Sequence, residues 1–152
     1  MIFRIAMLCG IIATGSASVG DAVKPPQPVY LGDVIYGISV PPFPLGRPVG
    51  IDHTLDDKPL NIKGVIYEKG MGVGSPTELI VSLDGQYTRF EAEVGVQTGT
   101  EIAIPLEITV DGKKLCAEPL APGVDAKPIS INVAGAKEMR LLVGGGAGAA
   151  VI

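Results

Sequence analysis

The chain has 152 residues, of which 47% are hydrophobic and 18% charged, and it contains 21 glycines and 13 prolines. This length suits one domain, and low charge with many turn-forming residues favours a β-rich fold. The formal net charge is -4, so the chain has no basic field to attract nucleic acid or an anionic membrane surface.

Residues 1–18 have the pattern of a signal peptide. Arg4 precedes an apolar run from Ile5 to Ala13, and Ser16-Ala17-Ser18 has the small side chains that signal peptidase accepts. We therefore predict cleavage near Ser18 and a secreted or periplasmic protein. The alternative is a short membrane anchor, but crossing the hydrocarbon takes ~20 apolar residues, and we predict no membrane span.

Cleavage there would remove Cys9 and leave Cys116 as the only cysteine. A lone cysteine makes no internal disulfide, so core packing must stabilise the domain. Because Cys116 follows a strand pattern, a small buried hydrophobic residue is the preferred interpretation, with a reactive thiol as the alternative.

The next segments alternate between loops and short strands. Residues 19–28 hold three prolines and predict an extended linker, whereas Tyr30 to Ser39 has the pattern of a first apolar strand. Val40 to Pro48 holds four prolines and Gly46, which indicates an irregular loop. Pro59 to Tyr67 predicts two short strands around a Lys63-Gly64 turn.

The central stretch, residues 67–96, contains two alternating patterns around Asp84-Gly85. Apolar residues recur at every second position before the turn and again after it. Asp-Gly is a favoured two-residue hairpin turn, so we predict a β-hairpin. Gly70, Gly72 and Gly74 precede it, and they suggest a bulge or the close approach of another backbone.

The second half continues the strand pattern. Ile102 to Val110 alternates over a long stretch, although Pro105 predicts an edge position or a bulge there. Asp111-Gly112 predicts a second hairpin into Lys113–Cys116, and 117–127 predicts a loop. Two more strands follow around Ile129–Val133 and Met139–Val143, and no helical period is present. Strands at this spacing predict an all-β sandwich.

Several of these segments carry a family resemblance. KGMGVGSPTEL followed by LDGQYTRFEAEVGV resembles the centre of an NPCBM domain, a carbohydrate-binding module of secreted glycoside hydrolases and related proteins. YLGDV, GRPVGID and DDKPLNIKGVIYEKG match its upstream order and spacing, and VDGKKL and DAKPISINVAGAKEMRLLV match downstream. The resemblance covers roughly Val29 to Val143. It implies a jelly-roll β-sandwich of the galactose-binding type, which we assign to residues 29–152.

The chain departs from the family pattern at three places. Tyr36 and Leu45 stand where the family commonly has Trp, and Gly74 stands where it has His. The tail, Gly144 to Ile152, lacks the family's Asp-x-Ala-Asp-Trp-Ala type motif. We therefore expect a sandwich without its closing strand, whose exposed edge could pair with a protein partner.

Candidate sugar-binding residues follow from the resemblance. Sugar-binding sites stack an aromatic ring on the sugar and bond its hydroxyls with polar side chains. Tyr36 and Phe43 are the possible platforms, although packing in the core or a loop is the commoner role of such residues. Arg47, at the family's Gly-Arg-Pro position, could bond a ligand or brace the loop. Asp52 and His53 complete the predicted ligand-binding set.

The segment around residue 55 is dense in carboxylates. Asp52, Asp56 and Asp57 could hold a structural Ca²⁺, which prefers several carboxylate and carbonyl oxygens. The preferred alternative is a solvated turn capped by aspartates. No other cofactor is indicated.

The sequence argues against catalysis. Glu91 and Glu93 share one strand face, and paired carboxylates can hydrolyse glycosides, but this spacing is ordinary on a solvated strand. A single His also leaves no Ser/His/Asp set. We predict a non-catalytic module that binds galactose-type or related glycans weakly. The alternative is a degenerate secreted β-sandwich used for protein contacts or scaffolding.

Overall fold

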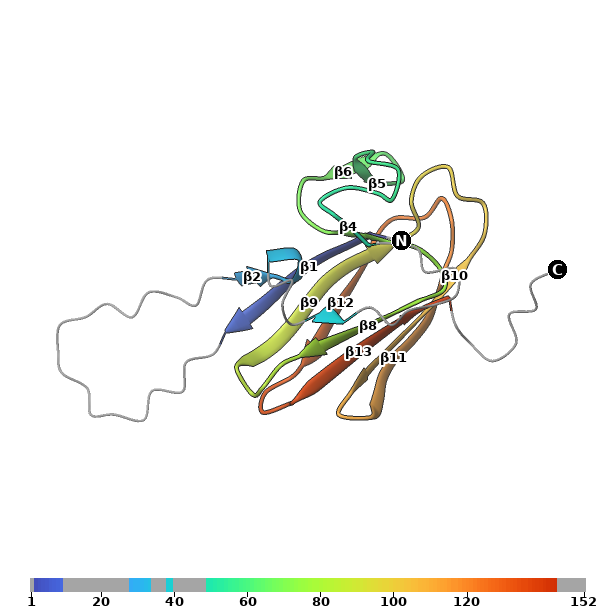
Figure 1. Ribbon diagram of the computed structural model, residues 1–152. Helices are drawn as coiled ribbons and strands as arrows, with labels where there is room; N and C mark the ends of the chain where they lie inside the picture. The colour runs from blue at the N-terminus through green and yellow to red at the C-terminus, as the bar shows by residue number, and fades with distance from the viewer. Residues whose placement is uncertain (1, 10–27, 34–37, 40–48, 145–152) are drawn as a thin grey trace, which may run out of the picture.

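The computed structural model describes residues 2–9, 28–33, 38–39 and 49–144 (Figure 1). The described part is built from strands and one short 3-10 helix, η1 (Leu31–Asp33), which confirms the predicted all-β class. The strands are β1 (Ile2–Cys9), β2 (Pro28–Tyr30), β3 (Ile38–Ser39), β4 (Val49–Ile51), β5 (Leu60–Ile62), β6 (Val65–Tyr67), β7 (Met71–Val73), β8 (Thr77–Ser82), β9 (Tyr87–Gly95), β10 (Ile104–Val110), β11 (Lys113–Leu120), β12 (Lys127–Asn132) and β13 (Glu138–Val143).

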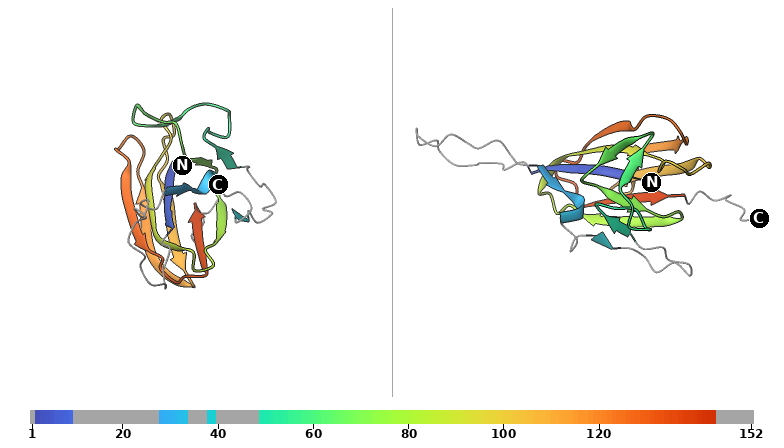
Figure 2. Two further views of the ribbon diagram at one scale, coloured as in Figure 1. Left: turned by 90° about the vertical axis from the view of Figure 1, so that its left-hand side faces the viewer. Right: turned by 90° about the horizontal axis from the view of Figure 1, so that it is seen from above.

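Two antiparallel sheets form the layers of a sandwich, as Figure 2 shows from two further directions. The six-stranded sheet has the order β12-β9-β1-β7-β4, and β2 pairs with β1 beside this path. The five-stranded sheet has the order β11-β10-β13-β8-β3. β5 and β6 form a separate two-stranded hairpin above one end of the sandwich (Figure 1).

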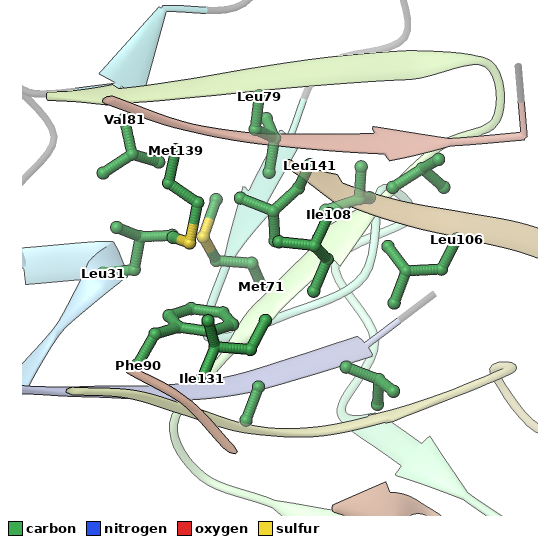
Figure 3. Close-up of a cluster of buried hydrophobic side chains, with 14 of the residues drawn as sticks. Leu31, Met71, Leu79, Val81, Phe90, Leu106, Ile108, Ile131, Met139 and Leu141 are labelled. Carbon is green, nitrogen blue, oxygen red and sulfur yellow. The ribbon is translucent and has the colours of Figure 1, made fainter. Parts of the chain in front are cut away.

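The core lies between the two sheets because their strands alternate apolar and polar residues. Phe90 and Met71 come from the six-stranded sheet, and Leu79, Ile108 and Leu141 come from the other sheet (Figure 3). All five side chains are at most 1% exposed. One continuous cluster therefore joins the two layers. Cys116 is half-buried and packs against this cluster, so the burial predicted for its side chain is only partial.

The Asp84-Gly85 turn corrects the hairpin prediction. Asp84 and Gly85 have φ values of 48° and 70°, as a tight turn of this kind requires. However, β8 pairs with β13 and β3, whereas β9 pairs with β12 and β1. The turn therefore carries the chain from one sheet to the other. Alternating apolar residues show only that β8 and β9 each have one buried face. Two strands joined by an arch between sheets have such faces, and so do two strands of a hairpin.

The other two predicted turns are confirmed as hairpins. Lys63-Gly64 joins β5 to β6, and Asp111-Gly112 joins β10 to β11. β11 extends to Leu120, so the loop predicted from residue 117 begins later than expected. β10 begins at Ile104 rather than at Ile102.

Pro105 lies on an interior strand, so the predicted edge position is wrong. β10 runs between β11 and β13, and its register shift falls between Ile108 and Thr109 rather than at Pro105. The β13 ladder begins with the pair Leu106 and Val143. Because Pro105 lies just beyond that ladder and opposite Pro119, no ladder hydrogen bond requires its missing N–H.

The structure differs from two predictions made for the N-terminal part of the chain. Residues 2–9, predicted to belong to a signal peptide, form β1 inside the six-stranded sheet. The strand predicted from Tyr30 is interrupted by η1, where Leu31 is fully buried. Most of the predicted linker, 19–27, and the tail, 145–152, lie outside the described residues.

Among the described residues, no helix has the length and apolar character needed to span a bilayer.

Candidate functional site

The loop after β4 is built on glycines. A Cβ atom on Gly72 would lie 2.5 Å from the backbone oxygen of His53, and one on Gly50 would lie 2.4 Å from the same oxygen. Only glycine lets the loop backbone approach β4 and β7 this closely. The close approach predicted for the glycine-rich strand is therefore confirmed at Gly72, and it sets the position of His53 and Thr54.

Asp52 fastens this loop to the residues before β7. Its backbone N–H donates to the Gly70 carbonyl oxygen at 2.8 Å, and its carboxylate accepts from the Gly70 N–H at 3.0 Å. Lys69 Nζ lies 2.8 Å from Asp52 Oδ2. Burial raises the pKa of Asp52, but the hydrogen bonds from Lys69 and Gly70 outweigh that effect and hold the pKa below its usual value. These contacts give Asp52 a bracing role.

His53 and Asp57 lie together in the same loop. His53 Nδ1 lies 2.7 Å from the Thr54 carbonyl oxygen and 3.4 Å from Asp57 Oδ1. The Thr54 hydroxyl oxygen accepts from the Lys58 N–H at 3.1 Å. The loop is therefore a capped turn, and the His53 side chain remains 46% exposed.

A second loop, residues 96–103, is tied to the β5–β6 hairpin. The Asn61 N–H donates to Gln97 Oε1 at 3.0 Å, and the Thr98 hydroxyl donates to Asn61 Oδ1 at 2.7 Å. The Thr98 N–H also donates to the Asn61 carbonyl oxygen at 2.8 Å. These bonds hold the hairpin and the loop as one unit beside the Asp52–Lys58 loop (Figure 1).

A cleft of about 330 Å³ opens where these loops meet the end of β7. It has polar groups from three segments and an apolar wall, which includes Ile102 with 67% of its surface exposed. The lining residues are Thr54, Leu55, Asp56, Gly72, Val73, Gly74, Ser75, Gln97, Thr100, Ile102 and Ile104.

Sequence reasoning missed most of this cleft. It selected the neighbouring Asp52 and His53, but it did not select Ser75, Thr100 or Ile102 as site residues. The polar run Gln97 to Thr100 between two strand patterns is the signal that could have indicated a loop at the same end of the sandwich. Tyr36, Phe43 and Arg47 lie outside the described residues.

The three aspartates proposed for Ca²⁺ do not form a metal cluster. Within the described ranges, no group of three or more His, Cys, Asp or Glu side chains is arranged to hold a metal ion. Asp52 is paired with Lys69, and the Asp57 carboxylate is 88% exposed beside His53. The capped turn, which was the alternative interpretation, describes the observed loop.

The Glu91 and Glu93 pair and the Cys116 thiol were the other candidates for reactive groups. Glu91 and Glu93 are half-buried on β9, and Arg89 Nη1 lies 3.6 Å from Glu91 Oε1. Burial, followed by the nearby Glu118, raises the pKa of the Cys116 thiol. A raised pKa makes a thiol less reactive at neutral pH.

This β-sandwich fold is that of a carbohydrate-binding module. The NPCBM/NEW2 domain matches residues 44–150, and the chain belongs to this family. None of the curated proteins matches the sequence.

Solved structures with the same fold are CBM51 modules. CBM51 from Clostridium perfringens GH95 in complex with methyl-galactose is 26% identical with a TM-score of 0.62, and the match covers 72% of this chain and 83% of that one. CBM51-2 of Clostridium perfringens ZmpB, solved with GlcNAc and INT domains, is 21% identical with a TM-score of 0.59, over 69% of this chain and 24% of that one.

Tandem CBM51 modules of a family 98 glycoside hydrolase from Streptococcus pneumoniae are 20% identical with a TM-score of 0.60. The match covers 79% of this chain and 42% of that one. At this level of identity the likeness concerns the fold, and this chain spans less than half of the second and third structures.

Proposed function

We propose that this protein is a secreted or periplasmic, non-catalytic module that binds galactose-type or related glycans weakly. The observation that carries the proposal is the cleft between the Asp52–Lys58 loop and the 96–103 loop, on a fold shared with CBM51 modules. The complex of the Clostridium perfringens GH95 module with methyl-galactose supports galactose as the first sugar to test.

The lining of the cleft suits a sugar ring. A pyranose has hydroxyl groups around its edge and apolar C–H faces, so its site combines hydrogen-bonding groups with an apolar surface. Asp56 and Thr100 offer a carboxylate and a hydroxyl, and Leu55 and Ile102 offer the apolar surface. We include Tyr36, Phe43, Arg47 and His53 as further ligand contacts. Asp52 acts by holding the loop in place.

The expected affinity is low because the chain has no Trp. An aromatic stacking contact contributes about 0.5–1.5 kcal/mol beyond the area that it buries. Losing two such platforms leaves a binding free energy of about -4 kcal/mol, which corresponds to a millimolar dissociation constant.

Titration of the isotope-labelled protein with methyl-galactoside, followed by NMR, tests this proposal. We expect saturable shifts at Asp56, Thr100 and Ile102, and their loss in Asp56→Asn and in the double variant Tyr36→Ala/Arg47→Ala. Arg89→Ala is the matched control, since Arg89 lies near the opposite end of β9 from the cleft. GlcNAc and glucose are titrated in parallel to compare sugars.

Undiminished galactoside binding by the Tyr36→Ala/Arg47→Ala variant would place the sugar site elsewhere. Absence of binding by any of the sugars would favour the alternative function, protein contact. That alternative has its own supporting observation, because Val65 and Ile66 on β6 are 54% and 63% exposed. Light scattering across a concentration series would then test whether the protein self-associates through this hairpin, with Ile66→Ser as the variant.

A further inference from the structure

The six-stranded sheet has an internal position that is filled by the most N-terminal strand. β1 lies between β9 and β7 in the sheet order, so it is an inner strand (Figure 2). All eight of its residues pair with β9, from Ile2 opposite Gly95 to Cys9 opposite Tyr87. On its other side β1 pairs with β7 through Ile2 and Phe3, and with β2 through Ala6 to Leu8.

Removing β1 from this position would leave backbone hydrogen-bonding groups of its neighbours unpaired. An inner strand satisfies backbone N–H and C=O groups on both of its neighbours, and unpaired groups on a sheet act as a template for another strand. Without β1, β9 would keep β12 on one side and lose its ladder on the other. β7 would keep only β4.

The sequence of β1 also agrees with its register. Phe3, Ile5 and Met7 pair with Val94, Ala92 and Phe90, which are the buried hydrophobic residues of β9. The basic Arg4 occupies the position opposite Glu93, which is half-buried. The other residues at alternate positions with Arg4, which are Ile2, Ala6 and Leu8, are also apolar. A strand that fits this position is therefore extended and largely apolar, with one basic residue opposite Glu93.

Residues 2–9 also lie within the predicted signal peptide. If the signal peptide is removed, the mature protein lacks β1; if it is kept, β1 stays in the sheet. A cut near Ser18 would separate β1 from the rest of the domain and open the space between β9 and β7. We propose that this space is a strand-acceptor site, which β1 fills within the intact chain and which binds the same segment as a separate peptide. Main-chain hydrogen bonds would give affinity, and alternate side chains would give specificity, as in other β-strand additions.

The test uses the full chain with one protease recognition sequence inserted after Ser18. The chain folds intact and is then cut, and a fluorescent peptide with the sequence of Met1–Gly10 is added in excess. We expect saturable binding of the peptide by anisotropy and exchange of the severed strand by native mass spectrometry. The control peptide carries prolines at positions 5 and 6. Because neighbouring amides point to opposite sides of a strand, one of these prolines removes a donor to β9.

No binding of the labelled peptide, or equal binding of the proline peptide, would overturn the proposal. A second measurement applies where the cut chain aggregates. In the uncut chain, Ile5→Pro/Ala6→Pro should lower the unfolding temperature by about 5 °C or more, whereas Ile11→Pro/Ile12→Pro, which lies beyond β1, should not. Equal unfolding temperatures of the two double-proline variants would also overturn it.

Discussion

Gly72 and Asp52 each fix the Asp52–Lys58 loop by a different physical means. Gly72 gives the loop backbone room, since a side chain at this position would meet the His53 oxygen. Asp52 adds hydrogen bonds from Lys69 and Gly70. The cleft depends on both residues, because Thr54 to Asp56 form one of its walls.

Replacing Gly72 with Ala should destabilise the protein by about 1–3 kcal/mol through overpacking. Gly95→Ala is the matched control, as Gly95 is also on an inner strand but the three atoms nearest to its added Cβ all belong to the side chain of Ile62. A side chain can adjust where a backbone oxygen cannot, so Gly95→Ala should cost less. Urea unfolding of both variants measures the difference, and an equal or larger cost for Gly95→Ala would contradict this explanation.

Asp52→Asn should lower the free energy of unfolding by about 1 kcal/mol near neutral pH, because a charged hydrogen-bond acceptor is lost. Asn tolerates the left-handed backbone of Asp52, where φ is 62°, so the change isolates the charge. Asp57→Asn is the control, since Asp57 has a φ of 57° but a carboxylate that is 88% exposed. Its effect should be near zero.

The effect of Asp52 should also depend on pH. Its pKa is lower in the folded protein than its ordinary value of 3.8. Its stabilising contribution is therefore fully present above the unfolded pKa and is lost as pH falls through the folded pKa. Unfolding measured at a series of pH values from 6 to about 2.5 should show the wild type and Asp52→Asn converging in acid. A constant difference down to the lowest pH would refute the assignment.

The two Asp-Gly turns show how one local signal serves two different connections. Asp84 and Asp111 have φ values of 48° and 47°, and a glycine with positive φ follows each. Asp111-Gly112 closes a hairpin, whereas Asp84-Gly85 carries the chain between sheets. The difference arises from the pairing of the strands. β8 pairs with β13 and β9 pairs with β12, and both partners lie far along the chain.

These turns provide a matched pair of substitutions. The Asp111 carboxylate accepts from the N–H groups of Lys137 at 3.0 Å and Glu138 at 2.9 Å, which ties the hairpin to the start of β13. Asp111→Ala should therefore destabilise the protein by about 1–2 kcal/mol more than Asp84→Ala. The backbone cost of Ala at positive φ is common to both variants and cancels. Thermal unfolding at pH 7 checks this, and an equal loss in both variants would show that the carboxylate contacts contribute nothing.

The elements themselves were largely predictable from the sequence, and their partners were not. Alternation at Phe90, Ala92 and Val94 correctly indicated a strand with one buried face. Pairing across the sandwich depends on residues distant in sequence, so the local pattern around Asp84 could not separate an arch from a hairpin. For the same reason, Pro105 predicts an edge position or a bulge, whereas it lies on an interior strand at a point where the neighbouring β13 ladder has ended.

The candidate site emerges only from the whole molecule. The sequence pointed to the loop around Asp52 because its acidic residues are close together in the chain. The opposite wall, with Thr100 and Ile102, follows β9 and lies some 45 residues further on. These two walls meet because β9 and β7 belong to the same sheet and the β5–β6 hairpin is tied to Gln97. Contacts of this kind have no local sequence signal.

The N-terminal segment gives the last prediction, since it has the pattern of a signal peptide and the position of an inner strand. Signal peptidase acts on the extended chain during export, before β1 can pair with β9, so processing should come first. When the gene is expressed with export in a bacterial host, the exported protein should begin near Val19 by N-terminal sequencing. Arg4→Glu, which reverses the charge of the predicted basic end, should reduce the exported amount.

An exported protein that begins at Met1 would contradict the signal-peptide prediction and would leave β1 in place beside β9. The two forms also differ in stability. The chain that begins near Val19 lacks the strand that pairs with eight of the nine residues of β9, so it should unfold at a lower temperature than the unprocessed chain purified from the cytosol. Because an added strand binds the folded state, the difference should shrink as a peptide of residues 1–10 is added in excess.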